Sequence, residues 1–249
     1  ARIVLEKQLS RVYRELDMVT TPSGWPCAMS HANNGTSDLN AWVGLFGEFA
    51  KLMGYQADMG ELFEKLYTNS LNGDPDCGGL LAYGYYSGEN ITMINEGRLA
   101  FLRTAESHFN LANFMKAHLY TSLGAVKMGL DILMEDEKVK VDRIMGHGGF
   151  FKTKGVGQRY LAAAVGAPVT VMDTASEGGA WGIALLAAYL IDKREGERLE
   201  DYLENRIFKE LAGETISPCA EDKKGFDIFM ERYKAGLEIE KKAIEVMNW

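Results

Sequence analysis

The chain has 249 residues, of which 47% are hydrophobic and 25% charged, the composition of an ordinary globular protein. Its net charge of −8 argues against a general nucleic-acid surface, which needs clustered Lys and Arg. No apolar run reaches the about 18 residues of a transmembrane helix, so we expect neither nucleic acid nor membrane as a partner. The three cysteines are widely spaced and no signal peptide is visible, which favours reduced thiols and a cytoplasmic location.

The first third of the chain predicts three short strands over residues 2–6, 16–20 and 26–31, separated by turn residues. A helix follows, with Ser37 as its expected N-cap and an apolar face that runs to Met53. A second helix is expected near 59–70. It ends before the turn sequence Asn72-Gly73-Asp74-Pro75.

The clearest helical pattern lies near 110–135, after a predicted strand at 79–86. Its apolar residues recur every three or four positions and form one stripe: Leu111, Met115, Leu119, Leu123, Val126, Leu130 and Leu133. His118 lies beside this stripe, so we interpret it as a core histidine with satisfied hydrogen bonds rather than as a metal ligand.

Strands at 141–146 and 168–172 then alternate with helices at 154–165 and 178–191. Three strands before any helix argue against a doubly wound fold, which alternates from its start. The order instead fits an α/β domain of the ribonuclease-H-like type found in actin- and hexokinase-like ATPases, with a mixed sheet and helices on both faces.

The segment 192–249 differs from the rest because close to half of its residues are charged. We expect two or three amphipathic helices there. The predicted organisation is a nucleotide-binding domain over 1–191 and a helical extension over 192–249 that packs on the same domain.

Two Gly-Gly pairs, Gly148-Gly149 and Gly178-Gly179, follow the last two predicted strands and open helices. Without a Cβ atom the backbone can come close to a ligand, and a helix N-terminus offers free N–H groups. Ligands of open α/β sheets also lie at the carboxyl ends of strands. The pairs therefore point to a nucleotide site. The alternative is that these glycines only form tight turns and allow close helix–sheet packing.

A third candidate segment, Asn33–Asn40, opens the first predicted helix and is rich in side chains that can bind a purine or a ribose. The same segment fits a capped turn equally well. Glu177 is either a magnesium or water ligand or an exposed acid at a helix start. The four histidines show no ligand spacing with Cys or acidic partners, so no metal site is expected on this chain.

These segments resemble the C-terminal domain of the FGGY family of carbohydrate kinases, on its xylulokinase-like side, over about residues 2–190. The stretch His147–Arg159 is similar to the family's adenosine motif, and Glu177–Ala187 is similar to its closing Ala-Leu-Gly-Ala-Ala helix. The stretch Ser37–Trp42 resembles the family's third nucleotide contact.

The resemblance implies a two-domain kinase with an actin-like fold and ATP in the cleft between its domains. Gly149 and Thr153 would then approach the adenosine. Lys154 stands beside the position of a family asparagine, and Phe150 replaces a usual alanine. The implied ATP-binding residues are Gly35, Asn40, Gly148, Gly149, Thr153, Lys154, Gly178 and Gly179.

The resemblance further implies the ATP-binding half of an ATP- and Mg²⁺-dependent kinase that phosphorylates a ketopentose such as xylulose or ribulose. The family's N-terminal domain, with its catalytic Asp and most of its sugar site, has no counterpart here. We therefore expect a fragment that is inactive alone and carries no catalytic residue, with the missing N-terminal domain and a small sugar as partners. A homodimer through the C-terminal helices is a further expectation. The rival hypotheses are an actin-like or chaperone-like ATPase module and an interaction protein that no longer binds ATP.

Overall fold

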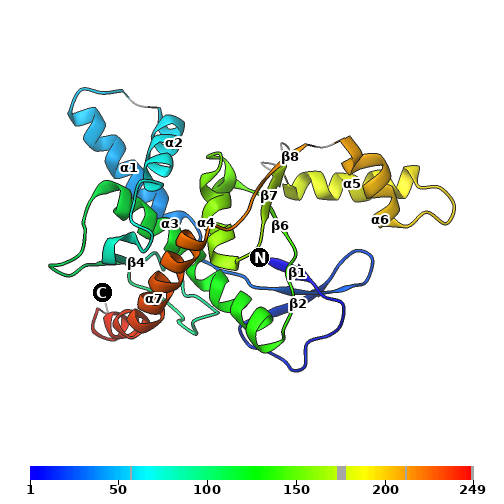
Figure 1. The fold of residues 1–249 in the computed structure, drawn as a ribbon, viewed down its shortest axis with the longest axis horizontal. Helices are drawn as coiled ribbons and strands as arrows, with labels where there is room; N and C mark the ends of the chain where they lie inside the picture. The colour runs from blue at the N-terminus through cyan, green and yellow to red at the C-terminus, as the bar shows by residue number, and fades with distance from the viewer. Residues whose placement is uncertain (57, 173–177, 211, 248–249) are drawn as a thin grey trace.

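The computed structural model describes residues 1–56, 58–172, 178–210 and 212–247 (Figure 1). Its strands are β1 (Arg2–Val4), β2 (Asp17–Thr20), β3 (Pro26–Met29), β4 (Leu81–Tyr83), β5 (Ala100–Leu102), β6 (Ile144–Gly146), β7 (Val169–Met172) and β8 (Gly213–Ile216). Its α-helices are α1 (Ser37–Leu52), α2 (Met59–Ser70), α3 (Leu111–Asp131), α4 (Val156–Val165), α5 (Gly178–Asp192), α6 (Leu199–Tyr202) and α7 (Ala220–Val246).

The strands are divided among three small sheets. One is antiparallel with the order β1-β3-β2, and the second pairs β4 with β5. The third has the order β6-β7-β8; β6 and β7 are parallel, whereas β7 and β8 are antiparallel. Because parallel neighbours need a crossover, α4 connects β6 to β7 in a β-α-β unit. The prediction of a mixed sheet is confirmed by this third sheet.

Helix α3 is the central element of the core. Residues Asn113 to Ala125 are buried without interruption, so this part of the helix is enclosed on all sides rather than along one stripe. The side chain of Asn110 caps α3 by accepting a hydrogen bond from the backbone N–H of Asn113 (2.8 Å). A π-helical turn at Ile132–Asp136 extends the helix, so the predicted range 110–135 is confirmed closely.

Helix α1 packs against α3 through aromatic and polar contacts. The rings of Trp42 and Phe114 meet edge to face at 4.8 Å, and His118 Nδ1 lies 3.1 Å from Asp38 Oδ2. His118 is buried as predicted, but its Nε2 atom has no hydrogen-bond partner among the described residues, so it is satisfied on one side only. The prediction of Ser37 as the N-cap is wrong. Thr36 occupies that position, because Ser37 is already the first residue of the helix, and Thr36 makes no side-chain capping bond.

The segment 192–249 is not purely helical, which corrects the prediction of a helical extension. It contributes strand β8, which lies beside β7 and completes the third sheet. The amphipathic helices expected there are α6 and α7. A bidentate ion pair connects α7 to α4. Arg159 on α4 donates from Nε (2.5 Å) and Nη2 (3.0 Å) to the buried carboxylate of Asp222 on α7.

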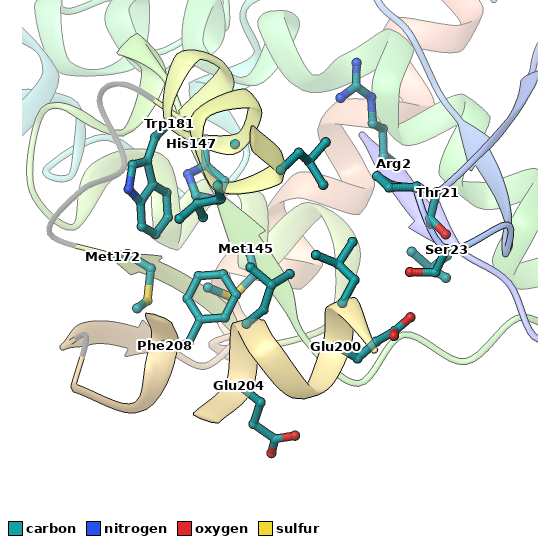
Figure 2. A pocket seen from close by; sticks show the side chains of 18 of the residues that line it. Arg2, Thr21, Ser23, Met145, His147, Met172, Trp181, Glu200, Glu204 and Phe208 are labelled. Atoms are coloured by element: carbon teal, nitrogen blue, oxygen red, sulfur yellow. The ribbon is translucent and has the colours of Figure 1, made fainter. Parts of the chain in front are cut away.

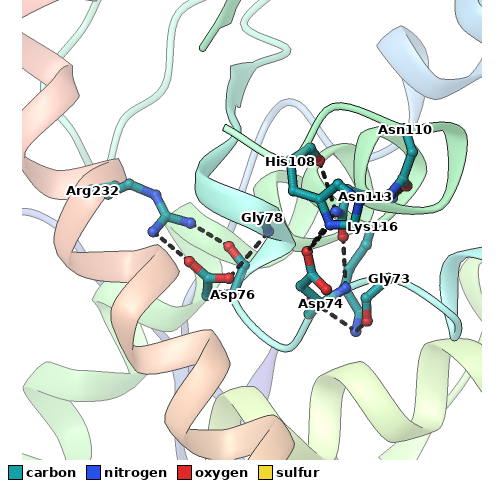
Figure 3. Close-up of polar contacts among 9 residues, drawn as sticks. All are labelled: Gly73, Asp74, Asp76, Gly78, His108, Asn110, Asn113, Lys116 and Arg232. Carbon is teal, nitrogen blue, oxygen red and sulfur yellow. Dashed lines mark hydrogen bonds and ion pairs between the residues drawn. The ribbon is translucent and has the colours of Figure 1, made fainter. Parts of the chain in front are cut away.

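The turn between α2 and β4 is held by polar contacts with two distant helices (Figure 3). On the α3 side, Asn113 Nδ2 donates to Asp74 Oδ2 (2.8 Å), and buried Lys116 donates to the carbonyl oxygens of Gly73 (2.8 Å) and Asp74 (3.2 Å). On the α7 side, Arg232 donates to Asp76 Oδ2 (2.9 Å). The turn therefore links the two longest helices of the fold.

Helix α5 contrasts with this core. It is apolar over most of its length, yet none of its residues is buried. In Figure 1, α5 and α6 lie together at one end of the molecule, away from α1, α2 and α3. Among the described residues, no helix is both long and apolar enough to cross a membrane.

Candidate functional site

The first Gly-Gly joint connects β6 to α4 by a closely packed turn. Gly148 has φ +97° and Gly155, the N-cap of α4, has φ +80°, values that L-residues rarely adopt. Phe150 lies over the start of α4. A Cβ on Gly157 would be 2.4 Å from its carbonyl oxygen and 2.9 Å from its ring. The phenylalanine thus packs inward and leaves the outer side of the joint to Gly148 and Gly149.

The alternative that these glycines only form a tight turn fits one glycine of this joint but not the other. Gly148 is needed for its backbone angle. Gly149 has no positive φ, and a Cβ built on it would meet nothing within 4 Å. Neither the turn nor the packing of this chain therefore requires glycine at position 149.

Thr153 and Lys154 follow at the entrance to α4. The carbonyl oxygen of Thr153 accepts a hydrogen bond from the N–H of Val156 (3.3 Å), which leads the chain into the helix. Lys154 Nζ lies 3.0 Å from Glu214 Oε2 on β8. Gln158, one turn further on, is buried and donates to the carbonyl oxygens of Val169 (3.3 Å) and Glu214 (2.8 Å). Gln158 therefore anchors α4 to the sheet.

The second joint follows β7, and residues 173–177, including the candidate Glu177, lie outside the described part of the chain. Helix α5 begins at Gly178. A Cβ on Gly178 would lie 3.0 Å from His147 Nδ1, so this glycine is explained by packing of the two joints against each other. Gly179, like Gly149, has open space where a Cβ would be.

A cavity of about 1330 Å³ lies beside this contact, bounded by β1, β6, α5 and the segment from α6 to Phe208. Figure 2 shows Trp181, Met145, Met172 and Phe208 gathered on one side of the cavity, and Arg2, Thr21 and Ser23 on the other. Gly178 and Gly179 line the cavity, as does His147. The other predicted site residues do not: Gly35, Asn40, Gly148, Gly149, Thr153 and Lys154.

The third predicted segment lies at the start of α1. A Cβ on Gly35 would meet nothing within 4 Å, and Gly35 has no positive φ. Asn40 is exposed in the first turn, where its N–H donates to the carbonyl oxygen of Thr36 (3.0 Å). The side chain of Thr36, the N-cap residue, accepts no hydrogen bond from the first N–H groups of this helix.

The structure thus brings the two joints together through His147 and Gly178. Among the predicted site glycines, Gly35, Gly149 and Gly179 have neither a positive φ nor a neighbour within 4 Å of a built Cβ, which is also true of Gly44 and Gly182. The cavity itself was missed by the sequence reasoning. Its walls come from segments far apart in the chain, such as Arg2, Met145 and Phe208, and no local pattern signals that they meet. Among the described residues, no group of three or more His, Cys, Asp or Glu side chains is arranged to hold a metal ion.

Comparison with known proteins identifies the family. Residues 3–191 match the model of the FGGY family of carbohydrate kinases, C-terminal domain. No curated protein sequence matches the chain significantly.

Several solved structures share the fold at low sequence identity. The ligand-bound xylulose kinase from Lactobacillus acidophilus superimposes with a TM-score of 0.69 at 15% identity, over 97% of this chain and 46% of that chain. A gluconate kinase from the same organism gives 0.69 at 16% identity, again over 97% of this chain and 46% of that one. The glycerol kinase of Plasmodium falciparum with ADP gives 0.64 at 13% identity, over 90% and 42%.

This chain therefore spans less than half the length of each of these kinases. At such identities the likeness shows the fold, which is actin/hexokinase-like as the order of strands and helices predicted. The family match covers the two Gly-Gly joints and the start of α1. The chain belongs to the FGGY family of carbohydrate kinases, and residues 3–191 form its C-terminal domain.

Proposed function

We propose that this chain is the nucleotide-binding half of an ATP-dependent carbohydrate kinase. The observation that carries the proposal is the unexplained glycine at position 149, in a joint that matches the family's C-terminal domain. A Cβ at Gly149 would meet no protein atom within 4 Å, which leaves room for the adenosine to approach the backbone there. Gly35 and Gly179 are open in the same way.

In the proposed complex, the backbone at Gly148 and Gly149 approaches the adenosine, with Thr153 and Lys154 at the edge of the same joint. Gly35 and Asn40 flank the nucleotide from the start of α1, and Gly178 and Gly179 do so from the start of α5. Free N–H groups at helix N-termini suit phosphate oxygens, because they combine hydrogen-bond donors with the positive end of the helix dipole.

Mg²⁺ is the metal that we propose for the reaction, bound mainly to the phosphates. Magnesium usually keeps several water ligands and takes one or two carboxylates beside the phosphate oxygens. A dedicated cage of acidic residues on this chain is therefore not needed.

The phosphoryl acceptor is proposed to be a sugar hydroxyl, and a ketopentose such as xylulose or ribulose is the favoured class. A carboxylate takes the proton from that hydroxyl, and the sugar oxygen attacks the γ-phosphate in line. We propose that this carboxylate and most sugar contacts belong to a preceding domain of the same protein, which closes over the nucleotide and excludes water. The proposed location is the cytoplasm.

A titration of the 249-residue chain with a fluorescent ATP analogue tests the proposal. We expect binding that Gly149→Val weakens at least tenfold, because the isopropyl group would fill the space held for the adenosine. Gly44→Val is the matched control, since Gly44 is also open and lies within α1, beyond the proposed contacts. Equal affinities for the wild type and the Gly149 variant would overturn the proposal.

A second measurement tests whether the catalytic carboxylate lies on another domain. Without a sugar-site carboxylate the chain should bind nucleotide but transfer no phosphate to xylulose or ribulose. Rapid sugar phosphorylation by the 249-residue chain would contradict the assignment of the catalytic carboxylate to another domain.

A further inference from the structure

The loop from His31 to Thr36, which leads into α1 and contains Gly35, belongs to no helix or strand. It is held by a segment more than fifty residues away. Asn34 Nδ2 donates to the carbonyl oxygens of Ser87 (2.6 Å) and Gly88 (3.1 Å), and its Oδ1 accepts from the N–H of Ser87 (3.0 Å). Asn34 is buried, so this side chain replaces the backbone pairing that the loop lacks.

Glu89 completes the attachment. Its Oε2 accepts a hydrogen bond from the backbone N–H of Asn33 (2.9 Å) and lies 3.5 Å from Asn34 Nδ2. The residue is fully buried, and its other carboxylate oxygen, Oε1, has no partner among the described residues. Burial of a carboxylate with one unpartnered oxygen costs the fold desolvation energy. Glu89 differs from other buried acids in that its partners, Asn33 and Asn34, lie in the loop before α1.

The backbone that carries Glu89 is fixed. Glu89 and Ile94 exchange two backbone hydrogen bonds (2.6 and 3.2 Å), and Thr92 Oγ1 donates to the carbonyl oxygen of Glu89 (3.2 Å). Gly88 has no room for a side chain, because a Cβ there would lie 2.3 Å from the carbonyl of Asn95. Glu89 therefore extends from a fixed backbone. Its hydrogen bond to Asn33 restrains the loop and lowers the loop's conformational entropy.

We propose that Glu89 is a positioning residue for the nucleotide, acting through the loop 33–35 without touching the ligand. The proposal rests on the proposed function, in which Gly35 and the start of α1 flank the adenosine. The hydrogen bond from the N–H of Asn33 to Glu89 orders the loop before the ligand arrives. Without this bond, the loop would become ordered only when the nucleotide binds. The entropy lost in that ordering would then lower the affinity for the nucleotide.

The experiment compares Glu89→Ala with Glu89→Gln and with Glu240→Ala in the 249-residue chain. Glu240 is the matched control: it is also fully buried with one unpartnered oxygen, but it accepts from the N–H of Arg98 (2.6 Å) and lies on α7. Two readouts are used, the dissociation constant of a fluorescent ATP analogue and hydrogen exchange of the peptide covering residues 31–40.

Glu89→Ala should weaken nucleotide binding about tenfold and raise exchange in the loop, in line with the loss of one buried hydrogen bond. Glu89→Gln should restore most of both, because its amide oxygen can accept from Asn33. Glu240→Ala should have neither effect, because Glu240 accepts its hydrogen bond from Arg98 and not from the loop. If Glu89→Ala does not fold, Asn34→Asp tests the same attachment, since it keeps the acceptor for Ser87 but places a second carboxylate beside Glu89.

Two results would overturn the inference: nucleotide affinity in Glu89→Ala equal to that in Glu240→Ala, or unchanged exchange in the loop. A wild-type chain that binds no nucleotide would overturn the proposed function, and the role of Glu89 toward the nucleotide with it. That outcome is distinguishable, because it is seen before any substitution is made.

Discussion

At the scale of single residues, the neighbouring glycines Gly148 and Gly149 in the first joint have different structural roles. Gly148 adopts φ +97° and ψ −177°, a conformation open essentially to glycine alone, whereas Gly149 has neither a positive φ nor a close neighbour. Gly148→Ala should therefore lower the free energy of unfolding by about 1–3 kcal/mol. Gly149→Ala should change it by less than about 0.5 kcal/mol. Urea unfolding followed by circular dichroism gives both values; equal losses would contradict the distinction.

Asp74 makes a pH-dependent contribution that can be isolated. Its carboxylate accepts from Asn113 Nδ2 (2.8 Å) and lies 2.7 Å from His108 Nδ1, and these contacts, Asn113 first, lower the pKa of Asp74. A carboxyl whose pKa is lower in the folded state stabilises the fold above its unfolded pKa, about 3.9. That contribution disappears as the pH falls through the folded pKa.

Asp74→Asn should accordingly unfold at a lower urea concentration than the wild type at pH 7, and the two midpoints should converge as the pH falls through the folded pKa of Asp74. The difference at pH 7 should stay below about 1 kcal/mol, because the side chain is 41% exposed and solvent screens its contacts. Midpoints measured from pH 2.5 to 7 test this. A gap that is constant over the whole range would mean that the charge of Asp74 is not what stabilises the turn.

At the scale of elements, two helical glycines should respond to alanine with opposite signs. Gly225 in α7 lies against the turn that follows α2: a Cβ there would be 2.2 Å from the backbone oxygen of Pro75. Backbone cannot rotate out of the way, so Gly225→Ala should cost about 1–3 kcal/mol through overpacking. Gly44 in α1 has open space, and Gly44→Ala should add about 0.5–1 kcal/mol through helix propensity.

Thermal and urea unfolding of the two variants test this pair together. Shifts in the same direction would show that α7 can move away from the turn, and that the contact with Pro75 does not fix its position.

The elements that the sequence predicted well are those with a local signal. Helix α3 shows the apolar periodicity of a core helix over six turns, and α5 starts where the second Gly-Gly pair opens it. Strand β8 was missed because its residues are mostly polar and exposed. It is a strand because β7 offers a free edge, where the hydroxyls of Thr170 and Thr215 meet at 2.7 Å. Pairing with a distant strand leaves no local pattern.

The same distinction holds for the candidate site. The positions of the glycines follow from local sequence, because a strand, a Gly-Gly pair and a helix are consecutive in the chain. The local sequence does not tell which of these glycines the packing requires. That depends on residues distant in the chain, such as His147, which packs against Gly178. The attachment of Asn34 to Ser87 is beyond sequence reasoning for the same reason.

At the scale of the whole molecule, the chain has a well-buried part and an apolar part that is not covered. The buried part centres on α3 and α7, where Tyr120, Phe226 and Phe229 pack together. Helix α5 has no buried residue, and Ile183, Leu190 and Ile191 are 70%, 71% and 83% exposed. Neighbouring exposed apolar side chains of this size favour association between protein surfaces.

The 249-residue chain should therefore self-associate through α5, and its weight-average mass should rise with concentration in analytical ultracentrifugation. Leu190→Glu combined with Ile191→Lys should reduce this association while leaving the net charge unchanged. Leu52→Glu combined with Val246→Lys is the matched control, because these residues are also exposed, at 82% and 60%, but lie on α1 and α7. The control should associate like the wild type, since its apolar positions are on separate helices. A wild-type chain that remains monomeric up to high concentration, or a control that loses association equally, would show that α5 is not the associating surface.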